Sequence, residues 1–506
     1  MRLNGRAAAL EALAQGRGAV VWQRLIADIE TPVSAALKLI EPGRGDWVLE
    51  SVESGETRGR YSLIGLDPDL MFEVTGDAAR INRDWRRDRA AFAPLAVPAL
   101  QALRELVAEC RFDVPEGLPK ALATLVGFFA YETIGLVEQR IARARGAGLA
   151  LPDMVFVRPT VILVFDRLAD ELFLIAPIWP DAAAPIDRLI DGAQERLDDV
   201  AARLSRASAH SARAQSKALP DDIHANAATP PERFTEMVAA AKDYIAAGDI
   251  FQVVLSQRFS TPFDLPPFDL YRALRRINPS PFLYFLDLPG FALIGSSPEI
   301  LVRVRDGEIT IRPIAGTRPR GRTSAEDAEN RESLLADPKE RAEHLMLLDL
   351  GRNDVGRAAV GGSVTVTDSY TVEFYSHVMH IVSNVIGRIA PGKDAIDALF
   401  AGFPAGTVSG APKVRACQII AELESDARGP YAGGVGYFAP DGNMDSCIVL
   451  RTAIVKDGEM HVQAGAGIVA DSDPAYEQRE CEAKAGALFA AAREAVRVAG
   501  TPGYGQ

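Results

Sequence analysis

Carboxylates on two predicted helices are the residues whose types and spacing best suit chemistry. Asp337-Pro338 and Asp473-Pro474 each predict a helix start, with aspartate as the N-cap and proline in the first turn. The first helix carries Glu343, and the second carries Glu480. Carboxylates from two helices suit a hard cation such as Mg²⁺, which commonly keeps waters and binds substrate oxygens. Spacing alone leaves a second interpretation open, in which these glutamates are solvated and stabilise their helices.

Three glycine-rich stretches form a second group of candidates: Gly402–Gly410, Gly429–Gly436 and Gly465–Gly467. None matches a Walker loop or a convincing dinucleotide fingerprint. Glycine allows the backbone to approach an anion closely, so anion binding is one interpretation. Tight turns between strands are the other.

Two further side chains follow apolar segments. His380 lies in Phe374–Ile386, which is predicted as a strand, and it shares a strand face with two valines. Such a histidine is either a satisfied core residue or a catalyst. A strand is predicted over Cys447–Val455. Within it, Arg451 closes the apolar segment Ile448–Leu450 and could bind a carboxylate through two parallel hydrogen bonds, or pair with a structural aspartate.

The elements that must position these residues mix strands and helices without regular alternation, which favours an α+β fold. The N-terminal half is rich in strands, including a hairpin over Thr160–Pro177. Residues 205–229 show no apolar period and predict a linker or surface loop. A helix is then predicted from an N-cap at Thr229 to Gly248. The resulting division is an N-terminal region over 1–204, the linker, and a C-terminal domain over 230–500.

Composition excludes several functional classes. The chain has 506 residues and a net charge of −13, which argues against nucleic acid or an anionic membrane as a main partner. Residues Met1–Gly18 contain no apolar core of signal-peptide length, and no apolar stretch is long enough for a membrane span. The four cysteines form no CxxC pair and are typical of reduced thiols in a cytoplasmic protein. Residue chemistry alone thus predicts a soluble α+β protein, compatible with a metal-assisted enzyme that acts on a small anion.

The C-terminal segments carry more information when they are read as motifs. They are Gly248–Gln252, Gly295–Glu299, Pro313–Gly321, Glu343–Asp354, Ser376–Ser383, Gly406–Cys417 and Gln463–Val469. In this order they resemble the chorismate-binding enzyme family over about residues 231–490. Two N-terminal segments, Asp28–Val33 and Leu49–Glu53, resemble the regulatory region of anthranilate synthase large subunits. The resemblance implies a large αβ complex in which two sheets and surrounding helices enclose a deep site.

The resemblance also implies a role for each matching residue. Glu343 and Glu480 would hold Mg²⁺ against the ring carboxylate of chorismate. Glu299 would be the general acid for the departing C4 hydroxyl, and His380 would assist the later departure of the enolpyruvyl chain. Thr407 would be a third catalytic residue, close to the ring. The substrate would contact Gly316, Thr317, Tyr431, Arg451, Gly465, Ala466 and Gly467.

Position 315 discriminates between members of the family. Enzymes that make aminodeoxychorismate commonly place a lysine there, whose amine can attack C2, whereas this chain has Ala315. A methyl group cannot attack and leaves room for ammonia. Isochorismate and salicylate synthases generally lack the tryptophan-site motif that Glu50-Ser51 supplies here. Anthranilate synthase is therefore favoured, with aminodeoxychorismate synthase or an inert tryptophan-sensing paralogue as alternatives.

The resemblance further implies partners and regulation. The sequence contains no Gly-x-Cys-x-Gly nucleophile turn, so we expect a separate glutamine amidotransferase subunit to supply ammonia, in an assembly of two large and two small subunits. Tryptophan would be a feedback inhibitor held by Glu50, Ser51, Pro281, Phe282 and Leu283. Many family members have Tyr-Met in place of Phe282-Leu283, so inhibitor affinity is expected to differ here.

Overall fold

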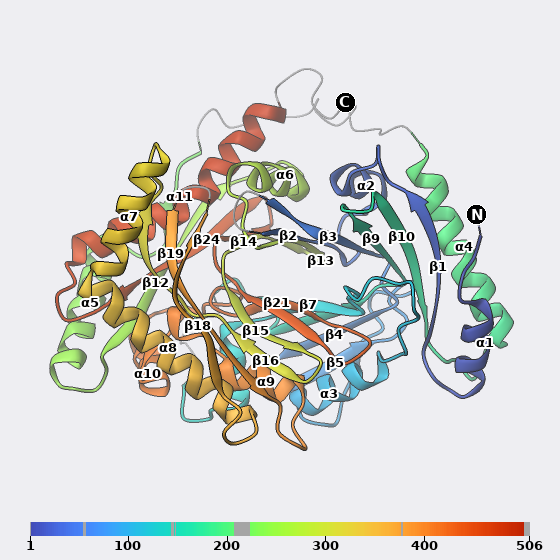
Figure 1. The fold of residues 1–506 in the computed structure, drawn as a ribbon, viewed down its shortest axis with the longest axis horizontal. Coiled ribbons are helices and arrows are strands. Elements are labelled where there is room, and N and C mark those ends of the chain that lie inside the picture. The colour runs from blue at the N-terminus through green and yellow to red at the C-terminus, as the bar shows by residue number, and fades with distance from the viewer. Residues whose placement is uncertain are drawn as a thin grey trace.

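Two large antiparallel sheets, surrounded by helices, form the body of the protein (Figure 1). The computed structural model describes residues 2–53, 57–142, 146, 148–206, 223–375 and 378–499. Within these residues each sheet has 12 strands, so the predicted α+β class is confirmed. The helices are α1 (Arg6–Ala14), α2 (Pro32–Leu39), α3 (Ala99–Glu109), α4 (Ile186–Leu204), α5 (Pro231–Ala246), α6 (Pro267–Ile277), α7 (Ser324–Ala336), α8 (Pro338–Ala358), α9 (Ala395–Gly402), α10 (Lys413–Leu423) and α11 (Pro474–Ala499), with short helices η1 (Tyr131–Leu136) and η3 (Gly406–Val408).

The first sheet combines strands from both halves of the sequence. Its spatial order is β1 (Ala19–Ile26), β10 (Glu171–Ile178), β9 (Val161–Asp166), β3 (Thr57–Leu66), β2 (Asp46–Glu53), β13 (Phe282–Leu288), β14 (Phe291–Ser297), β23 (Thr452–Lys456), β24 (Glu459–Ile468), β12 (Gln252–Pro262) and β11 (Asn226–Ala227), with β20 (Gly410–Ala411) also paired to β12.

The second sheet is built in the same mixed way. Its order is β17 (Ile314–Pro319), β19 (Val378–Arg388), β16 (Glu308–Ile311), β15 (Ile300–Arg305), β22 (Met444–Ile448), β21 (Gly434–Phe438), β7 (Leu125–Phe129), β8 (Met154–Arg158), β4 (Leu70–Thr75), β5 (Ala78–Asn82) and β6 (Ala93–Pro94), with β18 (Thr365–Phe374) paired to β19.

An apolar layer joins the facing sides of the two sheets. Trp47 of the first sheet is fully buried in the same cluster as Phe128 of the second. The rings of Phe128 and Phe291 meet edge to face across this layer, with 5.9 Å between centroids. Strands such as β8 and β9 are buried along their whole length, because helices cover the other side of each sheet. The division near residue 204 therefore stays a description of the sequence, since both regions share the sheets.

Several local predictions are corrected by the structure. The N-cap of α5 is Pro230 rather than Thr229, and no side chain among the described residues caps that helix end. Of the predicted linker, residues 207–222 lie outside the described residues, while β11 pairs with β12. The predicted strand over Phe374–Ile386 is divided, because Phe374 ends β18 and β19 begins at Val378.

The apolar run Cys447–Val455 is also two strands rather than one. β22 belongs to the second sheet and β23 to the first, so the chain crosses between the sheets at 449–451. Arg451 sits at this crossing with a positive φ of 47°. A non-glycine residue in that region is uncommon and interrupts the extended backbone, which is why a continuous apolar run does not form a continuous strand here.

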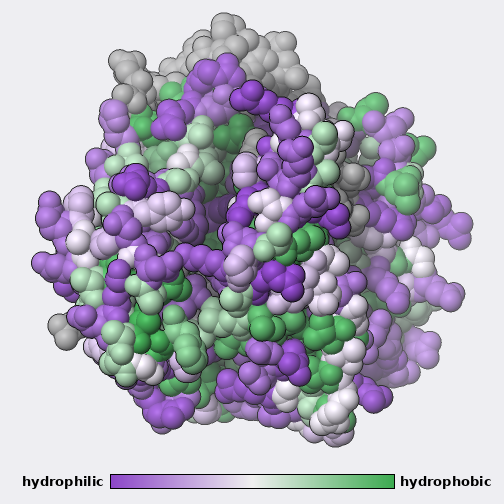
Figure 2. All heavy atoms as spheres, turned by 60° about the vertical axis from the view of Figure 1, so that its left-hand side comes forward, coloured by the Kyte–Doolittle hydropathy of each residue, from purple (hydrophilic) through white to green (hydrophobic). Residues whose placement is uncertain are grey.

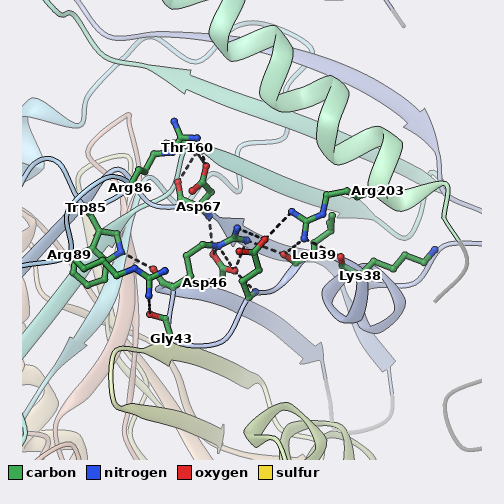
Figure 3. A network of polar contacts seen from close by, with 12 residues as sticks. Lys38, Leu39, Gly43, Asp46, Asp67, Trp85, Arg86, Arg89, Thr160 and Arg203 are labelled. Atoms are coloured by element: carbon green, nitrogen blue, oxygen red, sulfur yellow. Dashed lines mark hydrogen bonds and ion pairs between the residues drawn. The ribbon is translucent and has the colours of Figure 1, made fainter. Parts of the chain in front are cut away.

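A buried polar network fixes the start of β2 (Figure 3). Asp46 is fully buried, and its carboxylate accepts hydrogen bonds from the backbone N–H groups of Glu41 and Asp67, each at 2.9 Å. The Arg44 guanidinium lies 2.8 Å from the same carboxylate, and Arg203 of α4 pairs with Glu41 at 3.3 Å. The network joins α2, α4 and the first sheet, and it holds the strand whose far end carries the predicted inhibitor residues. None of the described helices is long and apolar enough to cross a membrane.

Candidate active site

A cavity of about 1240 Å³ opens between the two sheets and the helices α8 and α11. Eight of the predicted site residues line it: Glu299, Glu343, Thr407, Tyr431, Arg451, Gly465, Gly467 and Glu480. Figure 2 brings forward the side that carries α5, α7 and α8, and it shows a hollow bordered mainly by hydrophilic side chains. The structure therefore brings together residues that lie as far apart in the sequence as Glu299 and Glu480.

Glu299 lies where the chain passes from β14 of the first sheet to β15 of the second. Its side chain is 7% exposed and accepts a hydrogen bond from the Thr407 hydroxyl at 3.3 Å. Burial raises the pKa of Glu299 to about 8, although the hydrogen bonds from Thr407 and the backbone oppose this shift. The carboxyl is therefore protonated near neutral pH and can donate a proton into the cavity.

Arg451 lies at the second crossing between the sheets, directly beside the first. The Arg451 carbonyl accepts a hydrogen bond from the Ser296 N–H at 3.1 Å, and the Glu299 carbonyl accepts one from the Ile448 N–H at 3.1 Å. Burial lowers the pKa of Arg451, opposed by the nearby Tyr375. Among the described side chains no carboxylate forms an ion pair with Arg451, so its guanidinium is available to an anion in the cavity.

His380 forms a separate hydrogen-bonded group beside the cavity. Its Nδ1 lies 3.0 Å from the Gly316 carbonyl, which can only accept, so Nδ1 carries the proton. The Thr317 hydroxyl lies 3.1 Å from the same nitrogen. Burial, together with the charge of Arg451, lowers the pKa of His380 to about 4. The imidazole is thus neutral at pH 7 and presents Nε2 as a free base.

The helices α8 and α11 supply the acidic wall of the cavity. Glu340 and Glu343 come from α8, and Glu477 and Glu480 come from α11. Burial and then the charge of Glu340 raise the pKa of Glu343, to which Glu480 also contributes. Glu480 pairs with Lys484 at 2.6 Å. Neighbouring carboxylates that raise the pKa of Glu343 in this way favour binding of a cation beside it.

These oxygen donors fit an Mg²⁺ ion that is coordinated by both protein and substrate, rather than one that is coordinated by protein side chains alone. Within the described residues no group of three His, Cys, Asp or Glu side chains could hold a metal by itself. Mg²⁺ commonly takes one or two carboxylates and completes its octahedron with waters and substrate oxygens. Glu343 and Glu480 are the residues that would hold it.

The glycines of β24 allow the backbone itself to face the cavity. A Cβ at Gly465 would lie 2.6 Å from the Tyr431 hydroxyl and 2.8 Å from the Leu255 carbonyl. A Cβ at Gly467 would lie 2.4 Å from the Gln252 side chain. Ala466 does not line the cavity, because successive side chains in a strand point to opposite faces and its own is fully buried. The prediction that Ala466 contacts substrate can therefore apply only to its backbone.

Two residues that the sequence analysis did not single out support this strand and the Thr407 turn. Arg428 and Glu424 form a buried ion pair at 2.6 Å, with side chains 1% and 6% exposed. Their spacing of four residues beside the Gly429–Gly436 stretch is the signal that could have identified them. Spacing of this kind is common on helix surfaces, however, and does not indicate burial.

The predicted inhibitor segments are also adjacent. Glu50 of β2 pairs with Leu283 of β13 in the first sheet. The buried Glu50 carboxylate accepts hydrogen bonds from Tyr271 at 2.7 Å and Arg275 at 2.5 Å, and it also contacts Arg167 and Ser62. Because these donors fill its acceptor positions, Glu50 orders the surrounding arginines rather than offering a free carboxylate. Ser51, Pro281 and Phe282 are half-buried around it.

Comparison with known proteins agrees with this geometry. The model of the chorismate binding enzyme family matches residues 53–490. Anthranilate synthase component 1 of Cereibacter sphaeroides is 51% identical over 490 residues, which are 97% of each chain. The crystal structure of anthranilate synthase component I from Streptococcus pneumoniae has a TM-score of 0.72 at 35% identity and covers 92% of this chain and 99% of its own.

A more distant structure shows how widely the fold is shared. The menaquinone-specific isochorismate synthase of Escherichia coli has a TM-score of 0.69 at 19% identity, covering 96% of this chain and 99% of its own. That likeness concerns the fold alone. The resemblance inferred from the motifs is confirmed by the closer comparisons: the chain belongs to the chorismate binding enzyme family and, within it, groups with the anthranilate synthase component 1 proteins.

Proposed function

We propose that this chain converts chorismate and ammonia to anthranilate, pyruvate and water. The observation that carries the proposal is that a protonated acid, Glu299, and a cation without a carboxylate partner among the described residues, Arg451, lie at adjacent crossings and line one cavity. The reaction needs both features, because its substrate is a dianion and its first leaving group is a hydroxyl. Relatives that are 43–51% identical carry the name of this activity.

Glu299 supplies the proton for the first step. Ammonia adds at C2 of the ring, both ring double bonds shift, and the C4–O bond breaks as Glu299 donates its proton, so that water leaves. Thr407 donates to one carboxyl oxygen, which leaves the other to carry the proton. Hydroxide is a poor leaving group, and a positioned acid of this kind accelerates such steps by roughly 10²–10⁴-fold.

His380 suits the second step. The C2 proton is removed, the ether bond to the enolpyruvyl chain breaks, and protonation of the methylene carbon releases pyruvate while the ring becomes aromatic. Neutral His380 is fixed through Nδ1 to the Gly316 carbonyl and can accept the proton at Nε2. Arg451, the Gly465–Gly467 backbone and Tyr431 hold the substrate carboxylates during both steps.

Ammonia is the nucleophile because the protein offers no amine at the relevant strand position. Ala315 is buried on β17, directly before the bulge at Gly316 and Thr317. We propose that a glutamine amidotransferase subunit delivers the ammonia, as the designation component 1 of the relatives suggests. Mg²⁺ bound by Glu343 and Glu480 would neutralise the ring carboxylate and withdraw electron density from the ring.

Tryptophan is proposed as the feedback inhibitor at Glu50, Ser51 and the segment Pro281–Leu283. Support comes from the position of these residues beside one another in the first sheet. Glu50 also holds Tyr271 and Arg275 of α6, and α6 packs against α11, which carries Glu480. A ligand that moves β2 relative to β13 would therefore also move α6, and α6 contacts the helix α11 that lines the cavity.

The first prediction concerns the reaction itself. The purified chain, given chorismate, Mg²⁺ and ammonium chloride near pH 8, is expected to form anthranilate, which is followed by its fluorescence and identified by chromatography. Glutamine in place of ammonium should give no product until an amidotransferase subunit is added. Aminodeoxychorismate, isochorismate or no product from ammonium would contradict the proposed function.

The second prediction tests Glu299. Glu299→Gln should lower kcat/KM by about 10²–10⁴-fold, because the amide cannot supply the proton. In the unsubstituted protein Glu299 keeps its proton below its pKa of about 8, so activity should fall as the pH rises through that value. The variant should lack this fall. Glu482→Gln, on the exposed side of α11, is the control and should behave as the parent. An active Glu299→Gln with an unchanged pH profile would remove the assignment.

The third prediction tests the metal site. Glu343→Gln removes one anionic donor and should weaken Mg²⁺ binding by about tenfold or more, as measured by calorimetry. Turnover should be lost while the melting temperature stays near that of the parent. Glu332→Gln, on the exposed surface of α7, should change neither quantity. Undiminished Mg²⁺ affinity in Glu343→Gln would refute its assignment as a ligand.

The fourth prediction concerns regulation. Tryptophan titrated into the chain should bind in calorimetry and lower the initial rate with ammonium, whereas phenylalanine at the same concentration should do neither. Both effects are expected because the pocket residues reach the cavity through α6 and α11. If saturating tryptophan leaves the rate unchanged and shows no heat of binding, the inhibitor assignment is dropped.

A further inference from the structure

Arg428 lies behind the cavity and contacts three of the elements that form it. Its Nη1 donates to the Val408 carbonyl at 2.8 Å, and its Nη2 donates to the Val254 carbonyl at 2.7 Å. Its Nε and Nη2 also donate to the two oxygens of Glu424, at 2.8 and 2.6 Å. Four of the five N–H donors of the guanidinium are thus used in hydrogen bonds to backbone carbonyls and to one carboxylate.

The backbone groups that Arg428 holds are next to proposed active-site residues. Val408 follows Thr407, whose hydroxyl contacts Glu299. Val254 of β12 pairs with Gly467 of β24. One side chain therefore connects the turn beside the general acid to the strand whose backbone faces the substrate.

Glu424 extends the same connection along β12. Its Oε1 accepts hydrogen bonds from the Ser256 N–H at 2.8 Å and the Ser256 hydroxyl at 3.0 Å. Ser256 pairs with Gly465, and its hydroxyl also accepts from Gln463 at 2.9 Å. The ion pair therefore fixes β12 opposite both glycines that line the cavity.

The plane of the Arg428 guanidinium also orders an aromatic wall. The Arg428 Cζ atom lies 4.7 Å from the ring centroid of Tyr131 and 5.6 Å from that of Tyr431. Tyr431 lines the cavity, and its hydroxyl occupies the space where a side chain at position 465 would lie. Arginine suits this place because its planar group can stack on the rings while it donates several hydrogen bonds in its own plane. The ammonium group of lysine is not planar and cannot combine the two.

We propose that Arg428, together with Glu424, is the positioning residue of this active site, and that it sets the Thr407 turn, the Tyr431 ring and the Gly465–Gly467 strand relative to one another. The proposal rests on the proposed function, since it concerns catalysis on chorismate. A buried ion pair is weak evidence for a role in stability, because apolar residues of similar volume often replace such pairs without loss. The Arg428–Glu424 pair contacts the Thr407 turn, the Tyr431 ring and β12, and a residue that positions an active site must make such contacts to several of its parts.

The experiment separates positioning from stability with two sets of variants. Glu424→Leu with Arg428→Met replaces the pair by apolar side chains, and Arg428→Lys keeps the charge but cannot reach Val254, Val408 and Glu424 together. We expect the melting temperature of each to stay within a few degrees of the parent. We expect kcat/KM for chorismate with ammonium to fall roughly 100-fold, the loss that a displacement of about 1 Å produces.

The matched control is a similar arginine outside the cavity. Arg158 is buried, pairs with Asp69 at 2.9 Å and stacks on Trp179 at 4.8 Å. Asp69→Leu with Arg158→Met should change stability at most and leave kcat and KM unaltered. The proposal is overturned if folded Arg428→Lys and the Glu424–Arg428 double variant keep kcat and KM within threefold of the parent.

A mutant cycle gives a readout that a structural role would not move. Thr407→Val removes the hydroxyl that contacts Glu299. If Arg428 acts through this turn, the loss caused by Thr407→Val should be much smaller in the Arg428→Lys background than in the parent, whereas additive losses would overturn the proposal. Failure of the proposed function would be seen separately, as a parent protein that forms no anthranilate.

Discussion

The site depends on two points at which the chain passes between the sheets. β14 continues into β15 through Pro298-Glu299, and β22 continues into β23 through 449–451. The two crossings are hydrogen-bonded to each other. The Ser297 hydroxyl donates to the Ile448 carbonyl at 2.6 Å, and the backbone carbonyls of Glu299 and Arg451 accept hydrogen bonds from the opposite crossing. The surface of a flat sheet does not fix a buried acid or a buried cation in position, because only one sheet supports the backbone that carries it. Here each is carried by backbone that the two sheets fix from both sides.

Much of the fold follows from local signals in the sequence. Asp337 caps α8 as predicted, since its carboxylate accepts from the Lys339 N–H at 2.9 Å. The hairpin of β9 and β10 also lies where two apolar runs separated by a polar turn predict it. These features depend on residues within a few positions of one another. Periodicity alone could not predict which strands are neighbours, because β2 pairs with β13 across nearly half of the chain.

The misassigned strand over Cys447–Val455 shows the limit of such patterns. All its residues but Arg451 and Thr452 are apolar, so the run predicts one strand. The break is imposed by tertiary structure, which pairs the first part with one sheet and the second part with the other. Arg428 and Glu424 escaped prediction for a related reason. Charged residues four apart usually lie on a solvated helix surface, and only the packing of η3, β12 and Tyr431 around them makes them a buried pair.

The electrostatics of the cavity explain how an acidic protein can take an anionic substrate. Arg451 lies at the base, while Glu340, Glu343, Glu477 and Glu480 line the wall made by α8 and α11. A dianion with two separated carboxylates can place one of them on Arg451, but the other then faces like charges. A divalent cation between the glutamates and that carboxylate turns repulsion into attraction. Under the proposed function the same cation that activates the ring would therefore also hold the second carboxylate against the acidic wall, while Arg451 holds the first.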